Sequence, residues 1–190
     1  MRIHALSFTT LFFAACAAPQ ADEASAPETS GREPIRWETD GTTQEAFDAR
    51  TRYRAMSGEQ PDSVNRVVVD AFVVEKSPAV LEVAVRIRID EGWHIYARVP
   101  DGQPYVVTDI SLETPDGVIA SEEWDLPAPH ASLATAGVEE WSGEVIFLRE
   151  FDANEDFDRE EPFVVNVAYQ ACDERTCLPP ANVTIEVALE

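Results

Sequence analysis

Two cysteines near the C-terminal end carry the clearest chemistry in this sequence. Cys172 and Cys177 stand in the run YQACDERTCLPP, residues 169–180, and four residues separate them. The third cysteine of the chain, Cys16, lies near the N-terminus. Two thiols at this spacing can close as a disulfide, which either stiffens a loop or exchanges electrons with the thiols of other proteins.

The sequence pattern places this pair at the turn of a β-hairpin, between a strand that ends at Gln170 and one that begins near Val183. Residues that face each other across a hairpin lie about 4.5–5.5 Å apart at Cα, and a disulfide requires about 4.4–6.8 Å. So short a closed loop stabilises a fold by only about 2 kcal/mol in the chain-entropy model. Weak stabilisation and an accessible position favour redox use, but a structural disulfide stays open.

Metal binding is the weakest interpretation of the same cysteines. Their separation differs from the usual ligand spacing of structural zinc sites, and the histidines of the chain have no ligand-like spacing. The sequence therefore favours neither a metal site nor a cofactor, although metal handling by the thiols stays open as the weakest alternative.

The elements that must position the cysteines are predicted to be strands. From residue 64 onward apolar residues tend to recur at every second position, as in strands with one buried face. The expected strands cover residues 66–75, 81–89, 92–96, 106–112, 144–151, 163–170 and 183–189, and residues 121–142 are expected to be irregular. Many short strands with turns between them predict an all-β fold, an immunoglobulin-like antiparallel β-sandwich over residues 61–190.

The N-terminus has the features of an export signal. Residues 5–15 are mostly apolar but shorter than the roughly 20 residues that span a membrane, and they have the length of a signal-peptide core. They lead into FAAC, residues 13–16, which resembles the lipobox of bacterial lipoproteins. We therefore expect residues 1–16 to be a lipoprotein signal peptide with Cys16 as the lipidation site. Ala17, in place of Asp, favours the outer membrane.

Residues 17–60 are expected to form a flexible, acidic tether. Residues 17–34 have almost no large apolar side chain, so burial cannot offset the entropy lost on ordering. Further on, TTQE at residues 42–45 has the form of a capping box, and apolar residues then recur at helical spacing. A short helix from Thr43 to Met56 is expected, and the sequence leaves open whether it packs on the β domain.

The net charge of the chain is −22 at pH 7. Nucleic acids and anionic membrane surfaces repel such a chain, so neither is an expected partner. A solvated surface explains the acidity, and steering toward a basic partner is the alternative. Export places the chain where disulfides persist, and lipidation of Cys16 leaves Cys172 and Cys177 only each other as partners.

Three motifs together resemble a known family. YQAC at residues 169–172, followed by CLPP at residues 177–180, is similar to the characteristic motif of the N-terminal periplasmic domain of the thiol:disulfide interchange protein DsbD. GWHIY at residues 92–96 resembles the glycine-aromatic-x-x-Tyr strand of that family, and WDLPAP at residues 124–129 resembles its Trp-x-x-Pro segment. The resemblance covers residues 64–190 and implies an immunoglobulin-like domain with an electron-shuttling surface disulfide.

The resemblance also implies roles for single residues. Cys177 would form the mixed disulfide with a partner, and Cys172 would resolve it. The expected supporting residues are His94, Tyr96, Glu122, Glu123, Tyr169 and Gln170. The first two share one face of their strand, where proton handling or shielding competes with a packing role. The two glutamates match acidic residues of the family's cap loop, or they form a solvated turn.

The sequence thus predicts a thiol–disulfide oxidoreductase module that is lipid-anchored in the periplasm. Full-length relatives add a membrane-embedded and a thioredoxin-like domain that this sequence does not contain, so a separate membrane thiol reductase is the expected electron donor. Oxidised periplasmic thioredoxin-fold proteins are the expected acceptors. Two alternatives stay open: a non-catalytic binding or scaffold lipoprotein, and a metal-handling protein that uses the thiols with His94.

Overall fold

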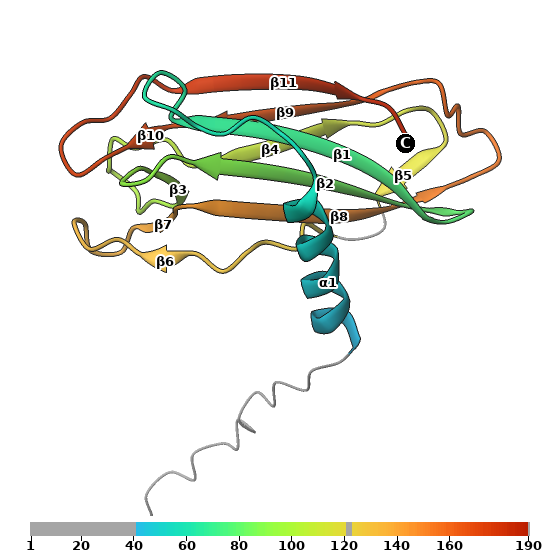
Figure 1. Ribbon diagram of the computed structural model, residues 1–190, viewed down its shortest axis with the longest axis horizontal. Helices are drawn as coiled ribbons and strands as arrows, with labels where there is room; N and C mark the ends of the chain where they lie inside the picture. The colour runs from blue at the N-terminus through green and yellow to red at the C-terminus, as the bar shows by residue number, and fades with distance from the viewer. Residues whose placement is uncertain (1–40, 121–122, 190) are drawn as a thin grey trace, which may run out of the picture. The chain divides into compact units, whose positions relative to one another are not determined.

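The computed structural model describes residues 41–120 and 123–189, with the side chains of the first helix from Asp48 onward (Figure 1). The described elements are α1 (Gly41–Ala55), β1 (Val67–Ser77), β2 (Val80–Ile89), β3 (His94–Arg98), β4 (Asp109–Glu113), β5 (Val118–Ala120), β6 (His130–Ala131), β7 (Glu139–Trp141), β8 (Glu144–Ala153), β9 (Phe163–Tyr169), β10 (Ala171–Cys172) and β11 (Ala181–Val187). The pairings between these strands are antiparallel. Among the described residues, no helix has the length and hydropathy to cross a membrane.

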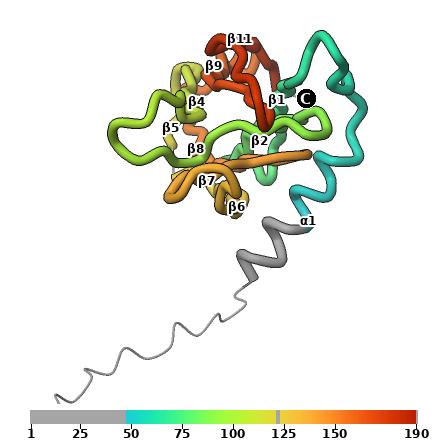
Figure 2. The backbone as a smooth tube through the Cα atoms, turned by 90° about the vertical axis from the view of Figure 1, so that its left-hand side faces the viewer, coloured from blue at the N-terminus to red at the C-terminus, as the bar shows by residue number. Residues whose placement is uncertain are grey.

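Two sheets enclose the main core. One has the strand order β1-β2-β8-β5 and the other has the order β11-β9-β4, and both views show the second sheet stacked on the first (Figures 1 and 2). Val85 of β2 and Phe147 of β8 pack in one cluster with Val165 of β9, and each is at most 1% exposed. The predicted all-β, immunoglobulin-like antiparallel sandwich is confirmed.

Strand β2 departs from the prediction, because both of its faces are buried. The alternation over residues 81–89 predicted one buried face, yet Glu82 and Arg86 on the other face are 3% and 0% exposed. Helix α1 explains the difference, since its Tyr53 is fully buried in a cluster with Ala84. The helix occurs close to the expected position and belongs to the same compact unit as the strands.

Buried polar groups hold α1 on this sheet. Arg86 donates hydrogen bonds to the carbonyl oxygens of Tyr53 (2.7 Å) and Met56 (2.8 Å). A third bond reaches the carbonyl oxygen of Ser57 at 3.0 Å. Carbonyls at the end of a helix have no donor within the helix, so Arg86 supplies one from the sheet. Its own charge is compensated by Asp70, at 3.0 Å.

We expect Arg86→Met to lower the free energy of unfolding by about 3 kcal/mol, because it removes the buried donor shared by three carbonyl oxygens at and just after the end of α1, together with the ion pair to Asp70. Urea denaturation followed by circular dichroism measures the change. Arg98→Met is the matched control, since Arg98 pairs with Glu139 at an exposed position, and its loss should cost less than about 1 kcal/mol. Equal losses at the two positions would show that Arg86 does not anchor the helix.

A smaller sheet with the order β10-β3-β7-β6 carries the cysteine motif. Strand β10 pairs with β3, where Cys172 faces His94, and β7 pairs with β3 on its other side, where Glu140 faces Tyr96. Strands β6 and β7 lie in the stretch that was expected to be irregular. They span only two and three residues, which is too short to give an alternating pattern. These pairings bring three distant segments together.

Candidate functional site

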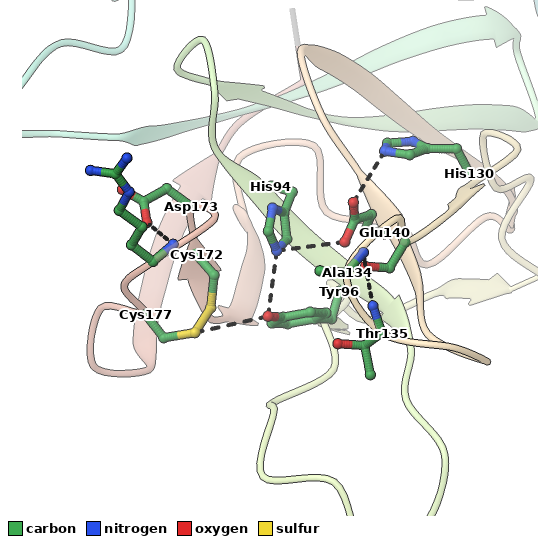
Figure 3. A network of polar contacts seen from close by, with 11 residues as sticks. His94, Tyr96, His130, Ala134, Thr135, Glu140, Cys172, Asp173 and Cys177 are labelled. Carbon is green, nitrogen blue, oxygen red and sulfur yellow. Dashed lines mark hydrogen bonds and ion pairs between the residues drawn. A yellow bond between two sulfur atoms is a disulfide. The ribbon is translucent and has the colours of Figure 1, made fainter.

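Cys172 and Cys177 form a disulfide at the turn of the β9–β11 hairpin (Figure 3). Their Cα atoms are 4.0 Å apart. The hairpin continues up to the disulfide, because the N–H of Leu178 donates to the carbonyl oxygen of Ala171 at 2.9 Å. The backbone thus holds the two cysteines opposite each other, and the predicted disulfide between them is present.

Asp173 shapes the loop between the cysteines. Its Oδ1 accepts hydrogen bonds from the N–H groups of Arg175 (2.7 Å) and Thr176 (2.6 Å), in a turn that Asp commonly forms. These backbone hydrogen bonds hold the pKa of Asp173 below its ordinary value, because they stabilise the charged carboxylate. The loop therefore has a defined conformation although it is exposed to solvent.

Gln170 and Tyr169, both expected as supporting residues, have different surroundings. Gln170 closes the base of the loop: its Nε2 donates to the carbonyl oxygen of Leu178 (3.1 Å), and its Oε1 accepts from the N–H of Val106 (3.0 Å). Tyr169 is 8% exposed and packs in the main core, and burial raises the pKa of its phenol. Gln170 therefore positions the cysteine loop, whereas Tyr169 contributes to packing.

The two cysteines differ in exposure. Cys172 is 1% exposed and packs in a small cluster with Tyr96 and Val138. Cys177 is exposed. Thiol–disulfide exchange requires that an attacking thiolate reach a sulfur atom, and of these two cysteines Cys177 is the one that offers an approach from solvent.

Tyr96 connects the disulfide to strand β3 and its neighbours. Its Oη lies 3.9 Å from Cys177 Sγ and 3.4 Å from His94 Nε2 (Figure 3). Its ring stacks on Tyr105, with 4.6 Å between centroids. Burial, together with the nearby Tyr105 and Glu140, raises the pKa of Tyr96 to about 12. The hydroxyl therefore keeps its proton at neutral pH.

We expect the phenol of Tyr96 to titrate near pH 12, above the ordinary tyrosine pKa of about 10. The unfolded chain then loses this proton first, so the contribution of Tyr96 to stability is complete below about pH 10 and declines as the pH rises toward 12. Phenolate absorbance is measured across this pH range for the wild type and for Tyr96→Phe. The difference between the two curves gives the titration of Tyr96 alone. A difference curve centred near pH 10 would contradict the buried position.

Glu140 on β7 lies between two histidines. Its Oε2 is 3.5 Å from His94 Nε2, and its Oε1 is 3.6 Å from His130 Nε2 (Figure 3). Glu140 is 8% exposed. Its carboxylate can therefore compensate a positive charge on either imidazole ring. Across residues 41–120 and 123–189, no group of three or more His, Cys, Asp or Glu side chains is arranged to hold a metal ion.

These side chains line one open cavity of about 710 Å³. Cys177, Tyr96 and Glu140 contribute to its wall, as does the loop of residues 132–135. Within this loop Leu133 is fully exposed. The cavity is thus large enough for side chains of another protein to approach the disulfide, and an apolar side chain stands at its edge.

Of the other expected residues, the structure describes only Glu123, which is not part of this arrangement. Glu123 is exposed and does not line the cavity. Glu122 and Cys16 fall outside the described residues, so the expected roles of Glu122 in a cap loop and of Cys16 in lipidation stay predictions.

Sequence reasoning missed Glu140, His130 and Tyr105. The first two come from β7, which pairs with β3, and from β6, which pairs with β7. Strands as short as these have no local sequence pattern. Tyr105 reaches Tyr96 from a connection that pairs with β3 only through an isolated bridge, Tyr96 to Val107. The sequence carries no local pattern that links these residues to the cysteines.

Comparison with known proteins gives one family match. The model of the family described as thiol:disulfide interchange protein DsbD, N-terminal, matches residues 66–189. A search of curated proteins found no match.

Three solved structures are similar in fold. The crystal structure of the N-terminal periplasmic domain of ScsB from Proteus mirabilis is 20% identical with a TM-score of 0.48, and the match covers 69% of this chain and 49%, about half, of that chain. The reduced DsbD N-terminal domain of Neisseria meningitidis is 17% identical, with a TM-score of 0.39 and coverage of 65% and 85%. The complex between the DsbD and PilB N-terminal domains of the same organism matches at 15% identity, with a TM-score of 0.42 and coverage of 68% and 88%.

Proposed function

This chain belongs to the family of the N-terminal domain of the thiol:disulfide interchange protein DsbD, and we propose that its Cys172–Cys177 pair passes electrons to oxidised partner proteins through mixed disulfides. The observation that carries the proposal is the asymmetry of the disulfide. A buried Cys172 is bonded to an exposed Cys177 at the wall of an open cavity. A partner's thiolate can attack such a bond at Cys177 Sγ, while the sulfur of Cys172 stays buried and close enough to re-form the bond.

The reaction follows from this asymmetry. In the reduced domain the Cys177 thiolate attacks one sulfur of the partner's disulfide, a new Cys177–partner bond forms, and the partner's other sulfur leaves with the electron pair and takes up a proton. Cys172 then loses its proton and attacks Cys177 Sγ. The Cys172–Cys177 bond forms again, and the partner's first sulfur leaves and is protonated. Two electrons and two protons pass from the domain to the partner.

The proposed partners follow from the family and the N-terminal sequence. A membrane thiol reductase supplies the electrons, and oxidised periplasmic proteins of the thioredoxin fold accept them. Lipid on Cys16 anchors the chain in the periplasm, at the outer membrane, and residues 17–34 act as a tether. The solved complex of a DsbD N-terminal domain with a PilB N-terminal domain is the kind of assembly that we propose for this chain.

A trapping experiment tests the proposed function. The oxidised full-length chain is mixed with a reduced thioredoxin-fold protein, quenched with an alkylating reagent and analysed by mass spectrometry. We expect Cys172 and Cys177 both to be labelled after mixing, because exchange opens their bond. A pair that stays unlabelled while the donor remains reduced would leave the alternative, a scaffold protein with a structural disulfide.

A further inference from the structure

One oxygen at the site lacks the partner that its burial requires. Glu140 is 8% exposed as a whole residue. Its Oε2 atom is buried and accepts no hydrogen bond from the described residues. A buried carboxylate oxygen without a donor costs free energy. The polar group nearest to it among the described contacts is His94 Nε2, at 3.5 Å. A proton on this nitrogen would supply the missing donor.

The same nitrogen also faces Tyr96. His94 Nε2 lies 3.4 Å from Tyr96 Oη, which lies 3.9 Å from Cys177 Sγ. In the neutral ring with its proton on Nδ1, Nε2 can accept a hydrogen bond from the tyrosine hydroxyl. In the protonated ring, Nε2–H can instead donate to Glu140. One nitrogen thus stands between a proton source and a buried acceptor (Figure 3).

We propose that His94 accepts the proton that the Cys177 thiol releases, through the Tyr96 hydroxyl, and that Glu140 positions His94 and stabilises its charged form. This inference rests on the proposed exchange reaction. His94 and Glu140 act through Tyr96 and are therefore positioning residues, whereas the Tyr96 hydroxyl itself contacts the reacting sulfur.

The proton transfer is balanced at each atom. The Cys177 thiol gives its proton to Tyr96 Oη while Tyr96 gives its own proton to His94 Nε2, so Tyr96 stays neutral throughout. The Cys177 thiolate then attacks the partner's disulfide, as described above. The sulfur that leaves the partner takes up one proton, and His94 is the acid closest to it along the Tyr96 hydroxyl. His94 returns to the neutral form, ready for the next cycle.

Several charged and titratable groups line the same cavity as His94. They are Tyr96 on β3, Glu140 on β7, His130 on β6, Tyr105 from the connection after β3, and Asp173, Glu174, Arg175 and Cys177 from the cysteine loop. Two of them, Tyr96 and Glu140, approach His94 Nε2 within 3.5 Å. The carboxylate of Asp173 is held by the backbone of its own loop. Glu140 is therefore the group best placed to compensate a proton on His94.

The test is the pH dependence of exchange. The reduced full-length wild type and His94→Gln react with oxidised glutathione from about pH 6 to about pH 10, and the second-order rate constant is measured at each pH. A glutamine side chain can form a hydrogen bond with the Tyr96 hydroxyl but cannot take up a proton from it. We expect the variant to be slower by about tenfold or more near pH 7. Above the ordinary thiol pKa of about 8.5 the two rates should converge, because the thiolate then forms without an internal acceptor.

Glutamate variants give a matched pair on the same strand. Glu140→Gln should show the same pH-dependent loss, whereas Glu139→Gln, whose side chain pairs with Arg98, should stay within about twofold of the wild type. An unchanged rate constant for His94→Gln would overturn the relay. A rate constant lowered by the same factor at every pH would also overturn it, because a structural defect would persist at high pH whereas the loss of a proton acceptor would not. A wild type that fails to react at any pH would overturn the proposed exchange itself, and the relay with it.

Discussion

A reduced Cys177→Ser variant is expected to lose exchange with oxidised thioredoxin-fold proteins by on the order of a thousandfold, as when the nucleophile of an enzyme is removed. Its remaining thiol, on Cys172, is 1% exposed and has no approach for a partner. The rate of partner reduction, followed by stopped flow, measures the loss. The effect is this large because the variant keeps a thiol but places it where a disulfide cannot reach.

Circular dichroism and urea denaturation of Cys177→Ser provide the control. The disulfide closes only a short loop, so its loss should lower the free energy of unfolding by about 2 kcal/mol and leave the fold intact. A folded Cys177→Ser variant that reduces partners at the rate of the wild type would refute the assignment of Cys177 as the attacking residue.

The opposite result is expected for Cys172→Ser. Its Cys177 thiol stays exposed and can attack a partner's disulfide, but the buried thiol that resolves the intermediate is gone. The mixed disulfide should therefore persist on the order of a thousandfold longer than in the wild type. Non-reducing electrophoresis and the intact mass of the adduct detect it, and treatment with a reducing agent should release both proteins.

The two cysteine variants control each other, because each removes one sulfur from the same disulfide. A stable adduct with Cys172→Ser and none with Cys177→Ser fits the observed difference in exposure. Adducts of equal yield from both variants would mean that burial does not select the attacking sulfur, and the proposed order of steps would then be wrong.

The sheet architecture could be predicted because it depends on local alternation. The pattern over residues 81–89 and 163–170 gave strands close to the observed bounds of β2 and β9. Burial of the second face of β2 could not be predicted, since it depends on a helix that precedes it in the chain. Arg86 has the character of a solvent-facing residue in the sequence, yet it is fully buried because α1 presents its terminal carbonyls to it.

The candidate site could be predicted only where its reactive residues are close together in the sequence. Cys172 and Cys177 are neighbours in the sequence, and the disulfide follows from hairpin geometry. Glu140 reaches His94 through the pairing of β7 with β3, whose paired residues lie about 45 positions apart in the printed sequence, and His130 reaches Glu140 through the pairing of β6 with β7. Each contact depends on a three-residue or two-residue strand, and tertiary packing rather than local preference sets its register.

The reduction potential of the Cys172–Cys177 pair tests the central claim most directly. The oxidised and reduced forms of the full-length chain are equilibrated with glutathione or dithiothreitol buffers, and the fraction of free thiol is fitted to a two-electron transition. We predict a potential near or above about −250 mV, in the range of exchange-active disulfides. A potential below about −300 mV, as is typical of structural disulfides, would contradict the proposal that this bond opens and closes in the working protein.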